Sequence, residues 1–333
     1  MSGAAVLGAG SWGTALAIHL ARSGSGAILW ARRPEAATAI QAARRNTDYL
    51  PGFSLPDDLI VTPRLEEALR GRRLVLLVVP AQSTRAIVRQ AVPSIDSSAD
   101  VVVASKGIEE GSGLRLTEIL RQEAPGSALG RASVLSGPSF ALEVARGDPT
   151  AIVVASNEDA AMARVQAALS AGNLRVYRNG DPIGVELAGA LKNVIAIASG
   201  IVEGLGLGLN TRAALITRGL AEITRLGTAL GGRAATFAGL AGAGDLILTC
   251  TGGLSRNRAL GIEIGRGRRL EDVLRGERTV AEGVATTRAA AALAARHGVE
   301  MPIVRKVEEV LFEGRPPRDA VFDLLARPLR EET

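Results

Sequence analysis

A lysine and an asparagine stand side by side in a stretch that otherwise consists of small and apolar residues. Lys192 and Asn193 lie within residues 184–203, where the pattern predicts a helix rich in Ala, Gly, Ile, Leu and Val. A lysine is costly to bury there unless it is paired or used. Burial lowers the pKa of a lysine, and such a group can donate a proton to a carbonyl oxygen as a hydride reaches the carbon. The alternative is a structural lysine that pairs with Glu186 or extends its charge to the domain surface.

Lysine is rare in this chain. Lys106, Lys192 and Lys306 are the only lysines, and arginine supplies the other basic side chains apart from two histidines. A lysine is a compact charge whose pKa can shift, whereas an arginine stays protonated. We therefore infer that a lysine in this chain marks a position where an arginine could not replace it.

A single carboxylate stands in a second apolar stretch, residues 240–251. Asp245 could orient a lysine ammonium or a substrate hydroxyl, and Thr249 lies one helical turn later on the same face. The alternative is that Asp245 caps the helix that follows. The glycines before Asp245 do not follow a first strand, so they do not predict a second dinucleotide site.

A glycine loop at residues 251–254 leads to the start of another predicted helix. Ser255 is a suitable N-cap, and Arg256 and Asn257 follow it directly. A helix N-terminus with an arginine beside it can bind a phosphate group. The alternative is an ordinary capped helix with an exposed arginine.

The first apolar run, residues 4–7, leads into a Gly-x-Gly-x-x-Gly motif. Gly8, Gly10 and Gly13 are followed by a helical pattern through Ala21, in the order of strand, turn and helix that a dinucleotide-binding fingerprint requires. The three glycines permit the tight turn, the approach of a pyrophosphate and close packing of the helix on the sheet. We predict cofactor binding here, and the alternative is a tight turn without a ligand.

The second apolar run ends at Trp30 and bears on the choice of coenzyme. Arg32 and Arg33 follow it, and no acidic residue stands at the strand end to hold a ribose 2′-hydroxyl. Guanidinium groups suit a 2′-phosphate. The sequence predicts that NADP(H) is accepted and leaves its preference over NAD(H) open.

Composition excludes several classes of protein. The 333 residues are enough for two domains, and the net charge of +5 is spread along the chain without basic clusters that would indicate nucleic-acid binding. Cys250 is the only cysteine, so we expect no internal disulfide and a cytoplasmic location. We see no signal peptide, no run long enough for membrane insertion and no spacing typical of a metal site.

The elements that position these residues alternate at first and then become helical. Helical patterns at 84–91, 113–123 and 157–169 separate apolar runs at 74–79, 100–104, 132–135, 151–155 and 174–177. This predicts an α/β Rossmann-type doubly wound domain over residues 1–178. Segments 80–83, 105–109 and 136–141 follow strands and should line one crevice beside the glycine turn. Residues 179–333 predict an all-α domain, with helices at 184–203, 211–230, 256–265, 280–297 and 303–313.

Eight motifs in register carry a family resemblance. They are Gly8 to Gly13, Leu50-Pro51-Gly52, Val79-Pro80, Ser105-Lys106-Gly107, Ser136-Gly137-Pro138-Ser139, Leu191-Lys192-Asn193, Gly242-Ala243-Gly244-Asp245 and Ser255-Arg256-Asn257. From Gly8 to about Glu282 the chain resembles the bacterial NAD(P)-dependent glycerol-3-phosphate dehydrogenases. The resemblance implies reversible reduction of dihydroxyacetone phosphate to sn-glycerol 3-phosphate for glycerophospholipid synthesis, in a cytoplasmic enzyme that is usually a homodimer.

The resemblance also implies roles for individual residues. Lys192 would be the general acid/base, and Lys106 and Asp245 would position the substrate. Substrate contacts would further include Gly137, Ser139, Asn193, Thr249, Ser255, Arg256 and Asn257. Cofactor contacts would be Ser11, Trp12, Arg32, Arg33, Tyr49, Lys106, Ala141, Arg256, Val280 and Glu282. Ala141, Val280 and Glu282 rest on resemblance alone, and the spacing from Thr279 to Glu282 is also that of a helix capping box.

Two other functions remain open at this point. A β-hydroxyacid dehydrogenase shares the two-domain plan and a Lys-Asn pair on a helix. A regulator that senses NAD(P) without catalysis is the other, although Lys106, Lys192 and Asp245 argue against it. For catalysis we expect the sheet domain to bind the cofactor, the helical domain to bind the substrate, and the reaction to occur between them.

Overall fold

The structure, a computed structural model, describes residues 3–275, 281–328 and 331. Its contacts divide the chain into two compact units. The first comprises Met1–Lys106 with Leu114–Glu186, and the second comprises Gly107–Gly113 with Leu187–Thr333. These units are defined by contacts alone, so the functional division after residue 178 stays a prediction.

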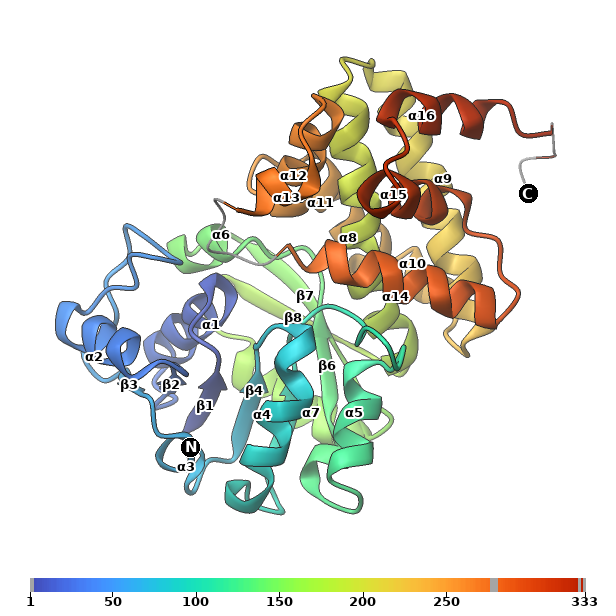
Figure 1. Ribbon diagram of the computed structural model, residues 1–333. Helices are drawn as coiled ribbons and strands as arrows, with labels where there is room; N and C mark the ends of the chain where they lie inside the picture. The colour runs from blue at the N-terminus through green and yellow to red at the C-terminus, as the bar shows by residue number, and fades with distance from the viewer. Residues whose placement is uncertain (1–2, 276–280, 329–330, 332–333) are drawn as a thin grey trace. The chain divides into compact units, whose positions relative to one another are not determined.

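The first unit is built on one eight-stranded sheet with the order β3-β2-β1-β4-β5-β6-β7-β8 (Figure 1). The strands are β1 Ala4–Leu7, β2 Ile28–Trp30, β3 Ile60–Thr62, β4 Leu74–Leu77, β5 Asp100–Val103, β6 Ser133–Ser136, β7 Thr150–Ala155 and β8 Leu174–Asn179. All neighbours are parallel except β6 and β7. The predicted fold class is confirmed. β3 is absent from the prediction.

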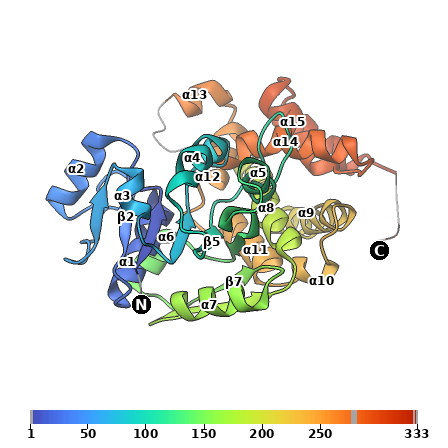
Figure 2. The ribbon, with the colours of Figure 1, turned by 90° about the horizontal axis from the view of Figure 1, so that it is seen from below.

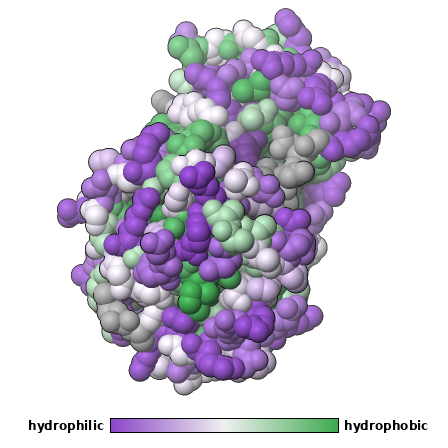
Figure 3. All heavy atoms as spheres, turned by 90° about the vertical axis from the view of Figure 1, so that its left-hand side faces the viewer, coloured by the Kyte–Doolittle hydropathy of each residue, from purple (hydrophilic) through white to green (hydrophobic). Residues whose placement is uncertain are grey.

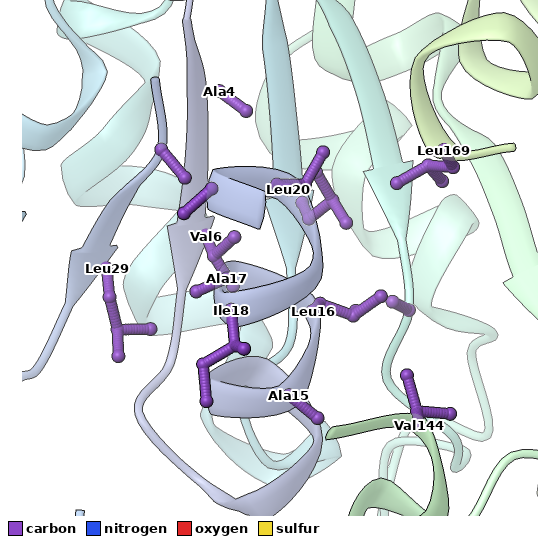
Figure 4. Packing of buried hydrophobic residues seen from close by; sticks show 14 of the residues in the cluster. Ala4, Val6, Ala15, Leu16, Ala17, Ile18, Leu20, Leu29, Val144 and Leu169 are labelled. Carbon is purple, nitrogen blue, oxygen red and sulfur yellow. The ribbon is translucent and has the colours of Figure 1, made fainter. Parts of the chain in front are cut away.

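Helices cover the sheet of the first unit. They are α1 Ser11–Arg22, α2 Pro34–Ala43, α3 Leu65–Leu69, α4 Thr84–Ala91, α5 Leu116–Glu123, α6 Ala141–Arg146 and α7 Asp159–Leu169, and Figure 2 shows several of them from below. Because parallel central strands are covered on both faces, their residues are apolar throughout. Val6 packs with Leu16 and Leu20 of α1 in one core cluster, shown in Figure 4. Leu7 belongs to a second cluster together with Val88 of α4.

The second unit is helical. Its helices are α8 Pro182–Gly204, which begins in the first unit, α9 Leu209–Ala229, α10 Ala234–Phe237, α11 Asp245–Thr251, α12 Arg256–Gly265, α13 Leu270–Leu274, α14 Glu282–Arg296, α15 Pro302–Phe312 and α16 Pro317–Leu325. A π-helical turn, η4 Leu240–Gly244, precedes α11. No β-strand is assigned within residues 187–275 or 281–328, as the all-α prediction requires.

Two stretches of the second half are apolar and long enough to cross a membrane, contrary to the expectation that no run reaches that length. They are Pro182–Gly204 and Ala234–Thr251. The most apolar window of the first is 100% buried within the protein, which is typical of a core helix, and that of the second is 44% buried. Figure 3 shows one face of the molecule, where polar side chains cover most of the surface.

Glycines bring α8 and α12 into backbone contact. A Cβ atom added to Gly200 would lie 2.1 Å from the carbonyl oxygen of Arg258, and one added to Gly261 would lie 2.1 Å from that of Ile197. Gly204 and Gly265 repeat this arrangement one turn later. Because only glycine permits such an approach, the two helices have a fixed separation. α8 carries Lys192, and α12 begins at the predicted phosphate-binding residues.

Candidate active site

The three fingerprint glycines occupy the positions that their predicted tasks require. Gly8 has a φ of +122°, which a residue with a side chain rarely adopts. A Cβ on Gly13 would lie 1.9 Å from the carbonyl oxygen of Gly8, so a side chain there would separate α1 from the turn. A Cβ on Gly10 would meet nothing within 4 Å, which leaves space for a phosphate group beside the first turn of α1. The residues present fit a dinucleotide.

Arg32 and Arg33 lie next to this turn. They follow β2, which pairs in parallel with β1, and the N–H of Gly8 donates a 3.0 Å hydrogen bond to the carbonyl of Trp30 at the end of β2. Both arginines are exposed. Arg33 makes a 3.9 Å surface ion pair with Glu35, a contact worth little.

Other predicted cofactor residues surround the start of α1. Ser11 is its first residue, and its hydroxyl donates a 2.5 Å hydrogen bond to the backbone carbonyl of Tyr49. Trp12 and Tyr49 are half-buried. Ala141 begins α6, which packs against α1.

The segments that follow β4, β5 and β6 lie together, as predicted for the ends of neighbouring parallel strands. The hydroxyl of Ser105 donates to the carbonyl of Val79 at 2.5 Å, and Lys106 Nζ donates to the carbonyl of Gly137 at 3.2 Å. Ser139 Oγ donates to the same carbonyl at 2.9 Å. Lys106, Gly137 and Ser139 therefore form one group at this edge of the sheet.

Lys192, Asp245 and Thr249 form a buried hydrogen-bonded cluster in the second unit. Lys192 Nζ donates to Asp245 Oδ1 at 2.5 Å and to Thr249 Oγ1 at 2.7 Å. The exposed fractions are 7% for Lys192, 1% for Asp245 and 4% for Thr249. The opposite charge of Asp245 offsets the cost of burying the ammonium.

The structure contradicts the structural alternatives for Lys192 and Asp245, and Lys192 does not extend to the surface. Glu186 accepts instead from Arg115 at 3.0 Å and from the backbone and hydroxyl of Thr117, and burial raises the pKa of its carboxyl. Asp245 is the first residue of α11, and Gly244 rather than Asp245 holds the N-cap position. Glycine is needed before it, since a Cβ on Gly242 would lie 2.0 Å from the carbonyl oxygen of Phe237.

Cys250, the residue after Thr249, is buried. Burial raises the pKa of its thiol to about 12, so the thiol stays neutral. Its backbone carbonyl accepts a 2.9 Å hydrogen bond from Ser199 of α8. This bond joins α11 to α8. Among the described residues, no group of three or more His, Cys, Asp or Glu side chains could hold a metal ion.

The predicted phosphate turn is a capped helix start. Ser255 Oγ accepts from the backbone N–H of Arg258 at 3.2 Å, and Arg256 is exposed. Asn257 is buried, and its Oδ1 accepts from the backbone N–H of Gly283 at 3.0 Å. Asn193 is also buried, and its backbone carbonyl oxygen lies 2.9 Å from where a Cβ on Gly283 would be.

The capping box from Thr279 to Glu282 stays a prediction. α14 is assigned from Glu282, with Ala281 at the N-cap position. Thr279 and Val280 lie outside the described residues.

Two family profiles match the chain in succession. The profile described as NAD-dependent glycerol-3-phosphate dehydrogenase N-terminus matches residues 3–162, and the one described as its C-terminus matches residues 181–322. The chain belongs to the NAD-dependent glycerol-3-phosphate dehydrogenase family. The resemblance inferred from eight motifs is thereby confirmed.

Members of this family cover the whole chain. The protein is 51% identical over 327 residues to a glycerol-3-phosphate dehydrogenase (NAD(P)+) of Syntrophotalea carbinolica, covering 98% of both sequences. It is 51% identical to one of Koribacter versatilis over 334 residues, covering 100% of this chain and 99% of the relative. A crystal structure of glycerol-3-phosphate dehydrogenase from Coxiella burnetii is 41% identical, with a TM-score of 0.93, and covers 98% of this chain and 99% of the other.

Two features near these sites were missed in the sequence. Arg258 donates to both carboxylate oxygens of Glu203 at 2.9 and 2.6 Å, which connects the start of α12 to the end of α8. Asn46 contacts the glycine turn, although it lies in a loop far along the sequence. No spacing marks Asn46, and Arg258 is one arginine among many. The resemblance to the dehydrogenases assigns neither Asn46 nor Arg258 to the substrate or cofactor site.

Proposed function

We propose that the chain transfers a hydride reversibly between NAD(P)H and dihydroxyacetone phosphate, with sn-glycerol 3-phosphate as the reduced product. The observation that carries this proposal is the buried cluster of Lys192, Asp245 and Thr249 in a chain that also contains a dinucleotide-type glycine turn. Relatives at 51% identity over nearly the full length bear the name of this activity.

Lys192 is the proposed proton donor. Asp245 and Thr249 hold its Nζ atom in place, and a proton from Nζ passes to the carbonyl oxygen of the substrate as the carbonyl carbon is reduced. In the reverse direction the same nitrogen receives the proton of the substrate hydroxyl. NAD(P)H supplies the hydride when it is bound.

The phosphate of the substrate is proposed to bind at the start of α12. The positive end of the helix and the exposed guanidinium of Arg256 are suited to a dianion. Asn257 supports this turn through its bond to Gly283. By resemblance to the family, Ser255 and Asn193 add polar contacts, as do Lys106, Gly137 and Ser139 from the first unit.

The first unit is proposed to bind the cofactor. Gly8, Gly10 and Gly13 with the N-terminus of α1 would hold the pyrophosphate, and Arg32 and Arg33 would hold a 2′-phosphate. By resemblance, further contacts come from Ser11, Trp12, Tyr49, Lys106, Ala141, Arg256, Val280 and Glu282. A homodimer, a cytoplasmic location and a role in glycerophospholipid synthesis belong to the same proposal.

The test is oxidation of NADH and of NADPH, followed by absorbance, in the presence of dihydroxyacetone phosphate. We expect turnover with both coenzymes and none with unphosphorylated dihydroxyacetone or a β-ketoacid at the same concentration. Turnover of the β-ketoacid alone would favour a β-hydroxyacid dehydrogenase. Binding of either coenzyme with no turnover of any phosphorylated triose would identify a sensor instead.

A further inference from the structure

A buried asparagine holds the glycine turn from outside the fingerprint. Asn46 lies after α2, in the loop that leads to β3, and is only 1% exposed. Its Nδ2 donates to the carbonyl oxygen of Ala9 at 2.9 Å and to Thr14 Oγ1 at 2.8 Å. Ala9 lies between Gly8 and Gly10, and Thr14 belongs to the first turns of α1. One amide therefore joins the glycine turn to the helix that follows it.

The orientation of this amide is fixed by chemistry. A backbone carbonyl only accepts hydrogen bonds, so the amide nitrogen must face Ala9. Two hydrogen bonds hold the loop that carries Asn46. The backbone carbonyl of Asn46 accepts from the N–H of Leu50 at 2.9 Å, and the backbone carbonyl of Tyr49 accepts from the hydroxyl of Ser11. Leu50 is buried in the core, which anchors the loop.

The contact determines which way one peptide group faces. In a trans peptide the C=O and the N–H point in opposite directions. With the Ala9 carbonyl held toward Asn46, the N–H of Gly10 faces the other way. The Ala9–Gly10 peptide can rotate because Gly10 has no Cβ to restrict it, and a rotated group would present a carbonyl oxygen where a phosphate needs a donor. The amide of Asn46 opposes that rotation.

We propose that Asn46 is a positioning residue that keeps the Ala9–Gly10 peptide in the orientation that binds pyrophosphate. The inference rests on the proposed cofactor site of the first unit. It predicts that loss of the amide weakens the binding of every ligand that contains the pyrophosphate. The binding of ligands that contact only Arg32 and Arg33 should be unaffected. The maximal turnover at saturating cofactor stays near that of the wild type.

The test compares two ligands by calorimetric titration. ADP-ribose contains the pyrophosphate, whereas adenosine 2′-monophosphate offers only the adenosine and the 2′-phosphate. Asn46→Asp replaces the amide donor with an acceptor of the same shape, and Asn46→Ser removes the amide without adding charge. The control is Asn173→Asp, the same change at an exposed asparagine of the same unit that donates to the carbonyl of Gly147.

We expect both Asn46 variants to raise the Kd for ADP-ribose about 5- to 100-fold, the range for an unsatisfied buried polar group. The Kd for adenosine 2′-monophosphate should change less than about twofold, and Asn173→Asp should change neither value. The KM for NADPH should rise with kcat nearly unchanged. If Asn46→Asp does not fold, Asn46→Ser decides the matter.

An unchanged Kd for ADP-ribose in a folded variant would overturn the inference, and so would an equal loss for both ligands. The proposed function fails separately. If the wild type binds ADP-ribose and the variants lose it while dihydroxyacetone phosphate is not reduced, the role of Asn46 stands and the substrate is wrong. If the wild type does not bind ADP-ribose, the role of Asn46 is refuted as well.

Discussion

Lys192 is buried, charged and held by two side chains from another helix. Asp245 and Thr249 are one turn apart on α11, so both can reach the same Nζ atom of α8. The pairing makes the ammonium tolerable in an apolar helix and gives it a defined position. A lysine kept only for stability would not need this arrangement, since an apolar residue of similar volume would serve as well.

Removal of Lys192 should separate catalysis from stability. Lys192→Met should lower kcat about 10²- to 10⁴-fold by loss of the proton donor, and destabilise the protein by about 3 kcal/mol because Asp245 stays buried without its partner. Adding Asp245→Asn should restore much of the unfolding free energy but not the turnover. Lys306→Met, in a lysine that pairs with Glu309 and Asp323, is the control. Near-normal kcat in Lys192→Met would remove this residue from the mechanism.

The two exposed arginines after β2 should govern coenzyme choice. Arg32→Ala and Arg33→Ala should each raise the KM for NADPH by about 10-fold, since a charged hydrogen bond to the 2′-phosphate is lost, with little change for NADH. Steady-state kinetics with both coenzymes measures the ratio. Equal changes for NADH and NADPH would mean that the arginines do not contact the 2′-phosphate.

For individual residues, the sequence indicated which side chains matter better than it indicated which residues they contact. Composition and spacing singled out Lys192, Asp245 and Ser255, and the structure shows that Ser255 is an N-cap as expected. They left open whether Lys192 pairs with Glu186, because both lie on one helix while Asp245 is 53 residues away. Contacts between distant segments, such as that of Asn46, leave no local signal.

The contact between α8 and α12 fixes the distance between two proposed parts of the substrate site. Gly261→Ala places a methyl group 2.1 Å from the carbonyl oxygen of Ile197, so the helices must separate. We expect a loss of about 2 kcal/mol or more in unfolding free energy and a raised KM for dihydroxyacetone phosphate in the folded protein.

The matched control is Gly253→Ala, because a Cβ at Gly253 meets nothing within 4 Å. Its unfolding free energy should stay within about 0.5 kcal/mol of the wild type. Denaturant titration measures both variants. Equal stability of the two would show that the helix contact yields to a methyl group at little cost.

Glu222 of α9 caps α15 and should make stability depend on pH. Its carboxylate accepts from the N–H groups of Ile303 and Val304, yet burial raises its pKa from 4.5 to about 7. Between these values the folded form stays protonated while the unfolded form ionises. Its contribution is therefore complete below about pH 4.5 and is lost as the pH rises through about 7, a change of about 3 kcal/mol.

Glu222→Gln should flatten this part of the profile, since the amide does not ionise. Chemical unfolding between about pH 4.5 and 7.5 measures the slope. Glu271→Gln, at a side chain that is 75% exposed, should leave the slope as it is in the wild type. A slope in Glu222→Gln equal to that of the wild type would assign the dependence to other groups.

The long helices of the second unit were predicted well, and several of its short helices were not. α12 has the predicted bounds, and α8, α9 and α15 differ by one or two residues at each end. The short helices α10 and α13 and the turn η4 carry too few residues for a period to show, and α16 was missed as well. The antiparallel pairing of β6 with β7 is set by the connection rather than by strand composition.

The whole molecule carries a net charge of +5. A positive field should assist the approach of an anionic substrate and should be screened by salt. We expect kcat/KM for dihydroxyacetone phosphate to fall several-fold between about 20 and 300 mM KCl, mainly through KM. A flat response would mean that only contacts at the site attract the phosphate.

The chain does not divide at one position, and this limits how the protein can be taken apart. Gly107–Gly113 belongs with the second unit, where Arg288 pairs with Glu110 at 3.1 Å and Arg296 donates to the carbonyl of Ser112. A gene fragment that starts after the sheet would omit these contacts. A chimaera that borrows the coenzyme-binding half of a relative must therefore keep this heptapeptide from the helical parent, with crossovers on both sides of it.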